Sequence, residues 1–161
     1  MPSITRADIK AAAARLTGVV RRTPLIRNAN LSRQYQCNVW LKREDLQEVR
    51  SYKLRGAYNM ISQMSASDLA RGVVCASAGN HAQGFAYSCN KLGVKGVVFM
   101  PVITPRQKIT QTRMFGNGAI EIVLTGDTFD DCAAAAKIYT AENGMTFIPP
   151  FDHLDIIEGQ V

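Results

Sequence analysis

Residues 71–100 read RGVVCASAGNHAQGFAYSCNKLGVKGVVFM. Two short apolar runs, residues 72–76 and 96–100, flank a segment in which apolar side chains recur at helical spacing as far as Gly93. Apolar runs rich in β-branched residues predict buried strands, and the spacing between them predicts one face of a helix. This stretch is therefore expected to form a strand, a helix and a second, parallel strand.

The same alternation continues toward the end of the chain. Two more apolar runs, residues 119–124 and 145–148, are expected to add strands whose faces are both buried. Between the runs, we expect one helix that Thr104 caps and another that Asp127 caps and Gly144 ends. The sequence thus predicts an α/β fold, an open parallel sheet with flanking helices.

The first seventy residues follow a different pattern. Residues 4–20 are expected to form a helix, residues 38–42 a short strand, and Ser51 the cap of a further helix. The buried face of that last helix is expected to hold Leu54, Ala57, Tyr58, Ile61 and Met64.

Composition limits the classes of function. Of 161 residues, 47% are hydrophobic and 20% charged, which predicts a globular domain with its own core. The net charge is +6, and residues 1–55 carry twelve Lys or Arg against four Asp or Glu. These cations are dispersed without a basic run, so we expect no nucleic-acid binding. An anionic small molecule, or an acidic surface elsewhere, is the expected partner for this charge.

Location and metal binding are constrained in the same way. The longest apolar stretch, residues 97–103, contains a proline and is far shorter than the roughly 20 residues of a membrane span. The first residues hold no apolar signal segment, so we expect no membrane association and a cytoplasmic location. Four cysteines lie far apart and only two histidines are present, which predicts free thiols and no metal site.

The first candidate for chemistry is the loop after the first strand, SAGNHAQG at residues 77–84. Ligands of open α/β sheets bind where strands end and helices begin. The Ser, Gly and Asn residues favour a tight turn, after which backbone N–H groups face an incoming anion. The same residue types also serve merely to cap helices, and the loop alone does not decide between these interpretations.

The second candidate is Lys53, in the first turn of its expected helix. The positive end of the helix dipole and partial burial both favour a neutral, nucleophilic amine there. Such a lysine can form a Schiff base with an aldehyde. A solvated surface lysine is the alternative interpretation.

Four segments together are more specific than either candidate alone. They are KRED at residues 42–45, SYKLRGA at 51–57, SAGNHAQG at 77–84 and PPFD at 149–152. In this order they resemble the pyridoxal-phosphate-dependent threonine dehydratases of fold type II. The resemblance covers essentially the whole chain but only the first half of that family's catalytic region.

The resemblance implies roles for individual residues. Lys53 would bind pyridoxal phosphate covalently and later act as the base at the substrate Cα. Tyr52 would border the cofactor ring and Asn80 would contact its hydroxyl. The substrate carboxylate would lie at Ser77, Ala78, Gly79, Asn80 and His81. His81 is expected to be structural rather than an acid or base, because the family's chemistry relies on lysine.

The implied reaction removes the β-hydroxyl of L-threonine, or of L-serine, and releases 2-oxobutanoate or pyruvate with ammonia. It would place the chain in isoleucine biosynthesis. Serine racemases of this fold carry a second serine at the position of Ala78, which favours elimination over racemisation. A racemase, a β-replacing synthase and a non-catalytic module that keeps the α/β scaffold remain as alternatives.

The resemblance also implies a domain division. Residues 1–45 would belong to the large domain, residues 46–150 would form the small α/β domain, and residues 151–161 would return to the large one. The family's phosphate-binding loop has no counterpart here, since the Gly116-Asn117-Gly118 stretch is expected to be only a hairpin-like turn. The isolated chain is therefore expected to be inactive and to lack a complete site for pyridoxal phosphate.

The end of the chain carries no helix stop, which predicts a truncated or divided protein. The apolar residues Leu25, Val39 and Leu41 would then need a cover. We expect a complementary C-terminal half or a dimer mate, and a homo-oligomer in solution.

Overall fold

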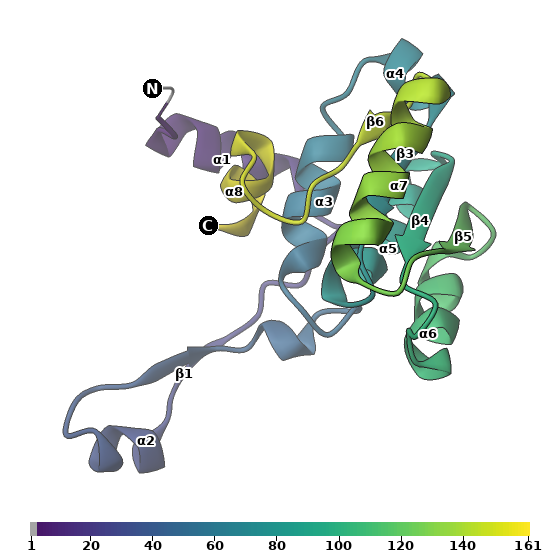
Figure 1. The fold of residues 1–161 in the computed structure, drawn as a ribbon. Coiled ribbons are helices and arrows are strands. Elements are labelled where there is room, and N and C mark those ends of the chain that lie inside the picture. The colour runs from purple at the N-terminus through teal and green to yellow at the C-terminus, as the bar shows by residue number, and fades with distance from the viewer. Residues whose placement is uncertain (1–2) are drawn as a thin grey trace.

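The computed structural model describes residues 3–161 and contains a four-stranded parallel sheet, seen on the right of Figure 1. The strands are β3 (Val73–Ala76), β4 (Gly96–Met100), β5 (Ile120–Leu124) and β6 (Thr146–Phe147), in the order β5-β4-β3-β6. They are connected by α5 (Asn80–Leu92), α6 (Arg106–Gly116) and α7 (Phe129–Glu142). The predicted open parallel α/β fold is confirmed.

The sheet separates two hydrophobic clusters. Alternate residues of β3 point to opposite faces, so that Val73 and Cys75 join the cluster under α5, while Val74 and Ala76 join the cluster under α7. All four are fully buried. Strands β3 and β4 are therefore covered on both faces, as their uniform apolar sequence predicts.

Strand β5 departs from that expectation. It is the edge of the sheet, and Glu121 and Leu124 are exposed. Only Ile120 and Ile122 pack against the core beneath α5. The prediction of two buried faces is wrong for this strand, because within residues 3–161 no further strand pairs with its outer edge.

Two helix starts and one turn also differ from prediction. Helix α6 follows Pro105 as N-cap, and the hydroxyl of Thr104 instead donates to the Pro101 carbonyl at 2.7 Å. Helix α7 is capped by Thr128, whose side chain forms a capping box with Asp131, so Asp127 is not the cap. The stretch 116–118 ends α6 and is not a hairpin turn.

The last helix, α8 (Leu154–Gln160), packs on α3 (Lys53–Ile61), and the first, α1 (Arg6–Arg15), packs on α8. Helix α4 (Ala66–Arg71) connects α3 to the sheet. The fully buried Asn59 joins the three helices: it accepts from Arg15 Nε at 2.7 Å and donates to the Asp155 carbonyl at 2.6 Å. The helix predicted for residues 4–20 ends at Arg15 and continues as turns.

An arm extends from this body at the lower left of Figure 1. It consists of β1 (Leu25–Arg27), α2 (Ala29–Gln34) and β2 (Trp40–Lys42), and the two strands pair antiparallel. The single-turn helix η1 (Glu44–Leu46) leads back to the body. Every residue of both strands is exposed. Among residues 3–161, no helix has the length and apolar character needed to span a membrane.

Candidate active site

The candidate site lies where the strand order of the sheet reverses. From β3 the chain proceeds outward to β4 and β5, and then returns to the other side of β3 with β6. The loops that follow β3 and β6 therefore meet at the carboxyl edge of neighbouring strands. This crevice is the usual ligand position in open α/β sheets. The predicted residues 77–81 span the loop after β3 and the first residues of α5, and the loop after β6 contains the PPFD segment.

Lys53 lies beside the second of these loops. Its Nζ amine donates to the carbonyl oxygen of Pro150 and lies 5.3 Å from the ring centre of Tyr52 and 5.9 Å from that of Phe151. A carbonyl oxygen and two aromatic rings are partners that an ammonium takes. Lys53 is half-buried, so the alternative of a freely solvated surface lysine is not what the structure contains.

Ser51 does not cap the helix that carries Lys53. The N-cap of α3 is Tyr52, in a helical conformation and without a side-chain hydrogen bond. The Ser51 hydroxyl is buried and has no hydrogen-bond partner among residues 3–161. The prediction of a Ser51 cap is thus wrong. A buried hydroxyl without a partner is costly, and here it lies two positions from the candidate lysine.

The loop at residues 77–81 has the features of an anion site. The Ser77 hydroxyl accepts from the Gly79 N–H at 3.2 Å, which shapes the turn. Gly79 is the N-cap of α5, and no side chain caps this helix. The N–H groups of its first turn, at exposed Asn80 and beyond, therefore remain available for a ligand. Ala78 contributes no hydroxyl to the loop.

His81 is the buried member of the loop, at 3% exposure. Its Nε2 lies 3.0 Å from the Ile148 carbonyl oxygen, while Nδ1 has no partner among the described residues. Burial lowers the pKa of His81 from 6.5 to about 4. The hydrogen bond to Ile148 raises this pKa, whereas the charge of Lys53 lowers it further. The ring is therefore neutral near pH 7.

Gly84 brings the two candidate segments together, which the sequence reasoning missed. A Cβ at this position would lie 2.7 Å from the Leu54 nitrogen and 2.9 Å from the Lys53 carbonyl carbon. Helix α5 thus packs directly on the backbone of α3 at Lys53. The available signal was the pair of glycines in the SAGNHAQG segment, of which only the second faces another backbone.

The KRED segment fixes α3 from the other side. Both carboxylate oxygens of Glu44 accept from Arg55, each at 2.8 Å. Burial raises the pKa of Glu44, but hydrogen bonds from Arg55, Thr23 and Gln47 outweigh it and lower the pKa from 4.5 to about 2. This bidentate pair connects the arm to the helix turn that carries Lys53.

A cavity of about 300 Å³ opens beside Asn80. Its charged lining residues are Arg50 and Lys108, and no acidic side chain lines it. Arg50 has a φ of 59°, a left-handed conformation that is uncommon outside glycine. The electrostatic character of this side of the loop is positive, which favours an anionic group near the free N–H groups of α5.

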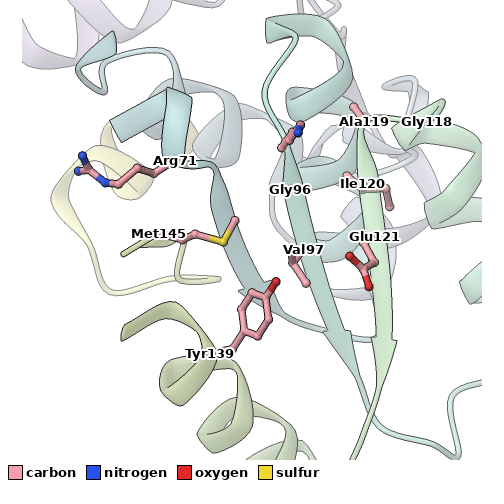
Figure 2. Close-up of a pocket in the computed structure, with 10 residues that line it drawn as sticks. Arg71, Gly96, Val97, Gly118, Ala119, Ile120, Glu121, Tyr139 and Met145 are labelled. Atoms are coloured by element: carbon pink, nitrogen blue, oxygen red, sulfur yellow. The ribbon is translucent and has the colours of Figure 1, made fainter. Parts of the chain in front are cut away.

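A further cavity of about 380 Å³ lies at the opposite, amino edge of the sheet (Figure 2). The side chains of Tyr139, Met145 and Glu121 border it, and it begins at Gly96, the first residue of β4. It contains none of the candidate residues. Within residues 3–161, no group of His, Cys, Asp and Glu side chains is placed to hold a metal, and all four cysteines are free thiols.

The profile of the family described as "Pyridoxal-phosphate dependent enzyme" matches residues 16–161. The chain belongs to this family. Pyridoxal phosphate is the cofactor that the family implies, and the side chains present fit it: a primary amine flanked by two aromatic rings, next to an uncapped helix N-terminus. The resemblance to threonine dehydratases is confirmed by individual members as well.

Among pyridoxal-phosphate dependent enzymes, the biosynthetic L-threonine dehydratase IlvA of Staphylococcus aureus is 54% identical over 98% of the chain. Processed threonine deaminase isoform 2 of Solanum lycopersicum has a TM-score of 0.84 at 37% identity, with 98% of this chain and 46% of that one covered. The chain spans 37% of the length of the Staphylococcus enzyme.

A serine racemase of Dictyostelium discoideum superposes equally well. Its TM-score is 0.86 at 29% identity, over 97% of this chain and 50% of that one. The fold therefore does not separate elimination from racemisation within the family. The difference in identity, 54% against 29%, favours the dehydratases.

Proposed function

We propose that the chain provides the lysine and substrate loop of a threonine dehydratase, which converts L-threonine to 2-oxobutanoate and ammonia, or L-serine to pyruvate and ammonia. The observation that carries the proposal is the position of Lys53. It lies at the reversal point of the sheet, where its amine donates to the Pro150 carbonyl in the loop after β6. The 54% identity to a biosynthetic threonine dehydratase supports the choice of substrate.

The chain's own residues divide the work. Pyridoxal phosphate, when bound, supplies an electron sink for the charge left at the substrate Cα. Lys53 would hold the cofactor through its amine. After the substrate amine has replaced it there, the freed Lys53 amine would take the Cα proton. Tyr52 borders the cofactor ring and Asn80 contacts the ring hydroxyl. Lys53 keeps its amine close to the bound substrate, so that the proton moves only a short distance from Cα to Nζ. This proximity is the main contribution expected from Lys53.

The substrate carboxylate is proposed to bind at the start of α5. Support comes from the uncapped first turn of this helix, whose N–H groups at Asn80 and His81 point out of the helix end. Ser77 and Gly79 shape the turn, and Arg50 with Lys108 makes its surroundings positive. The His81 side chain itself faces Ile148, so its share in the site is proposed for the backbone amide.

Ala78 is proposed to set the outcome of the reaction. By the resemblance to serine racemases of this fold, a hydroxyl at this position would offer a proton to the face of Cα opposite Lys53, whereas the methyl group of alanine offers none. The assay supplies the chain with the C-terminal part of the Staphylococcus aureus enzyme, adds pyridoxal phosphate, and follows 2-oxobutanoate from threonine and inversion of serine. Inversion without 2-oxo acid release would overturn the dehydratase proposal in favour of a racemase.

We propose that the arm of residues 25–42 is a docking surface for the polypeptide that follows the matched region in the longer relatives. Support comes from the apolar side chains exposed on the arm, namely Leu25, Ile26, Tyr35, Trp40 and Leu41. A second copy of the chain is the alternative occupant. Light scattering separates them, because a homo-oligomer forms without any added polypeptide.

A cytoplasmic location is also proposed. Its support is that three of the four free thiols, Cys75, Cys89 and Cys132, are buried in the core and form no disulfide. Cell fractionation tests it: recovery of the chain in a secreted or periplasmic fraction would contradict the proposal.

A further inference from the structure

His81 has an unusual combination of features for a residue next to a candidate active site. It is buried, and only one of its two ring nitrogens has a partner. A carbonyl oxygen only accepts, so Nε2 must carry the proton that is donated to Ile148. Nδ1 is then an unprotonated acceptor without a donor. A buried side chain with one unpaired nitrogen calls for an explanation, and the hydrogen bond that its other nitrogen makes is where we look for one.

The role of His81 follows from the two hydrogen bonds that Ile148 makes. The Ile148 N–H donates to the Val74 carbonyl of β3 at 2.8 Å, and the Ile148 carbonyl accepts from His81. The next two residues, Pro149 and Pro150, have no N–H and cannot be fixed by donors of their own. Their rings also restrict the backbone. The Ile148 carbonyl is therefore the last anchored group before the Pro150 carbonyl.

The Pro150 carbonyl is the acceptor for Lys53 Nζ, and Phe151 follows with its ring 5.9 Å from the same atom. Any rotation of the segment about Ile148 thus moves the oxygen and the ring that locate the amine. Helix α5 controls Lys53 in two ways, since Gly84 abuts its backbone and His81 holds the segment that meets its side chain.

We propose that His81 is a positioning residue for Lys53, which fixes the segment 148–150 through its Nε2–H and so sets the place of the lysine amine. This inference rests on the proposed function, because only a reactive lysine needs its amine to be held in one place. Its physical content, a coupling between the His81 hydrogen bond and the environment of the Lys53 amine, is measurable in the chain without any cofactor.

The test is competitive acetylation of the 161-residue chain with trace acetic anhydride, read out by peptide mass spectrometry as the ratio of Lys53 to Lys91 modification. Lys91 is a matched internal reference, because its amine lies 5.5 Å from the Tyr87 ring but distant in sequence from the segment. In His81→Leu the amine loses its fixed acceptor, and the ratio is expected to rise about 3- to 10-fold, as for a local opening of ~1 kcal/mol.

The conservative variant His81→Gln decides between positioning and packing. Its amide places a donor near the position of Nε2, so the ratio is expected to return to within about twofold of the unmodified chain. If His81→Leu does not fold by circular dichroism, His81→Asn takes its place, since its shorter amide stops one bond short of Ile148. An unchanged ratio in a folded Leu or Asn variant overturns the inference, as does a Gln variant that behaves like Leu.

A second, parallel experiment tests the proposed function separately from this result. The same variants are incubated with pyridoxal phosphate and the C-terminal part of the Staphylococcus aureus relative, and are then reduced with borohydride. Failure of the unmodified chain to label at Lys53 counts against the proposed function alone, because acetylation still measures the coupling through His81.

Discussion

The Lys53 amine donates a hydrogen bond to the carbonyl of Pro150, 97 positions further along the chain. The contact joins the start of α3 to the segment that leaves β6. Neither element is a neighbour of the other in sequence, and both reach the same place because β6 returns beside β3. The geometry of the candidate site is therefore a property of the sheet order rather than of any single motif.

Gly84→Ala is expected to destabilise the chain by about 1–3 kcal/mol, since the added methyl group would overlap the backbone at Lys53 and Leu54. Urea unfolding followed by circular dichroism measures the change. Gly79→Ala is the matched control, because an added Cβ there meets no atom within 4 Å. Equal stability of the two variants would contradict the close approach of α5 to α3.

In Glu44→Gln, the free energy of unfolding is expected to fall less steeply as the pH is lowered than in the unmodified chain. The folded pKa of Glu44 is about 2, below its ordinary value of 4.5. The unfolded chain therefore binds this proton first, so the stabilisation is complete above pH 4.5 and is lost as the pH falls toward 2. The loss in the variant at pH 7 is expected to be about 1–2 kcal/mol after solvent screening.

Thermal unfolding at several pH values measures this effect, with Glu142→Gln as the control on an exposed helix end. The control is expected to follow the unmodified chain at every pH. An unmodified chain whose stability does not change between pH 5 and 3 relative to Glu44→Gln would contradict the low pKa of Glu44.

The fluorescence of Trp40 can detect a polypeptide that binds to the arm. It is the only tryptophan and is 54% exposed. If the C-terminal part of the Staphylococcus aureus relative binds the arm, the fluorescence of Trp40 is expected to shift to shorter wavelength as water leaves the ring. Leu41→Ser, on the same strand, is expected to weaken that shift. No shift under conditions where light scattering detects a complex would place the contact elsewhere.

Local patterns in the sequence were sufficient for the sheet and its crossover helices. The apolar runs at residues 72–76 and 96–100 predicted β3 and β4, and the helical spacing between them predicted α5 to its end at Leu92. Choices between adjacent residues were harder. Asp127 and Thr128 are both good N-caps, and the choice of Thr128 depends on Asp131 completing a capping box.

Contacts between distant segments could not be read from local patterns. The pairing of β1 with β2 joins strands of only three residues, and the exposure of β5 follows from its place at the edge. Lys53, Tyr52, Asn80 and the loop around them were identified as candidates by motif. Their partners Pro150, Phe151 and Gly84 required the tertiary arrangement.

The central claim is that Lys53 is the amine that binds pyridoxal phosphate. The direct measurement is borohydride reduction of the chain with pyridoxal phosphate and the C-terminal part of the Staphylococcus aureus relative, followed by peptide mass spectrometry. One labelled peptide is expected, and it contains Lys53. Its label persists in Lys91→Ala and disappears in Lys53→Ala. Equal labelling of another lysine, undiminished in Lys53→Ala, would contradict it.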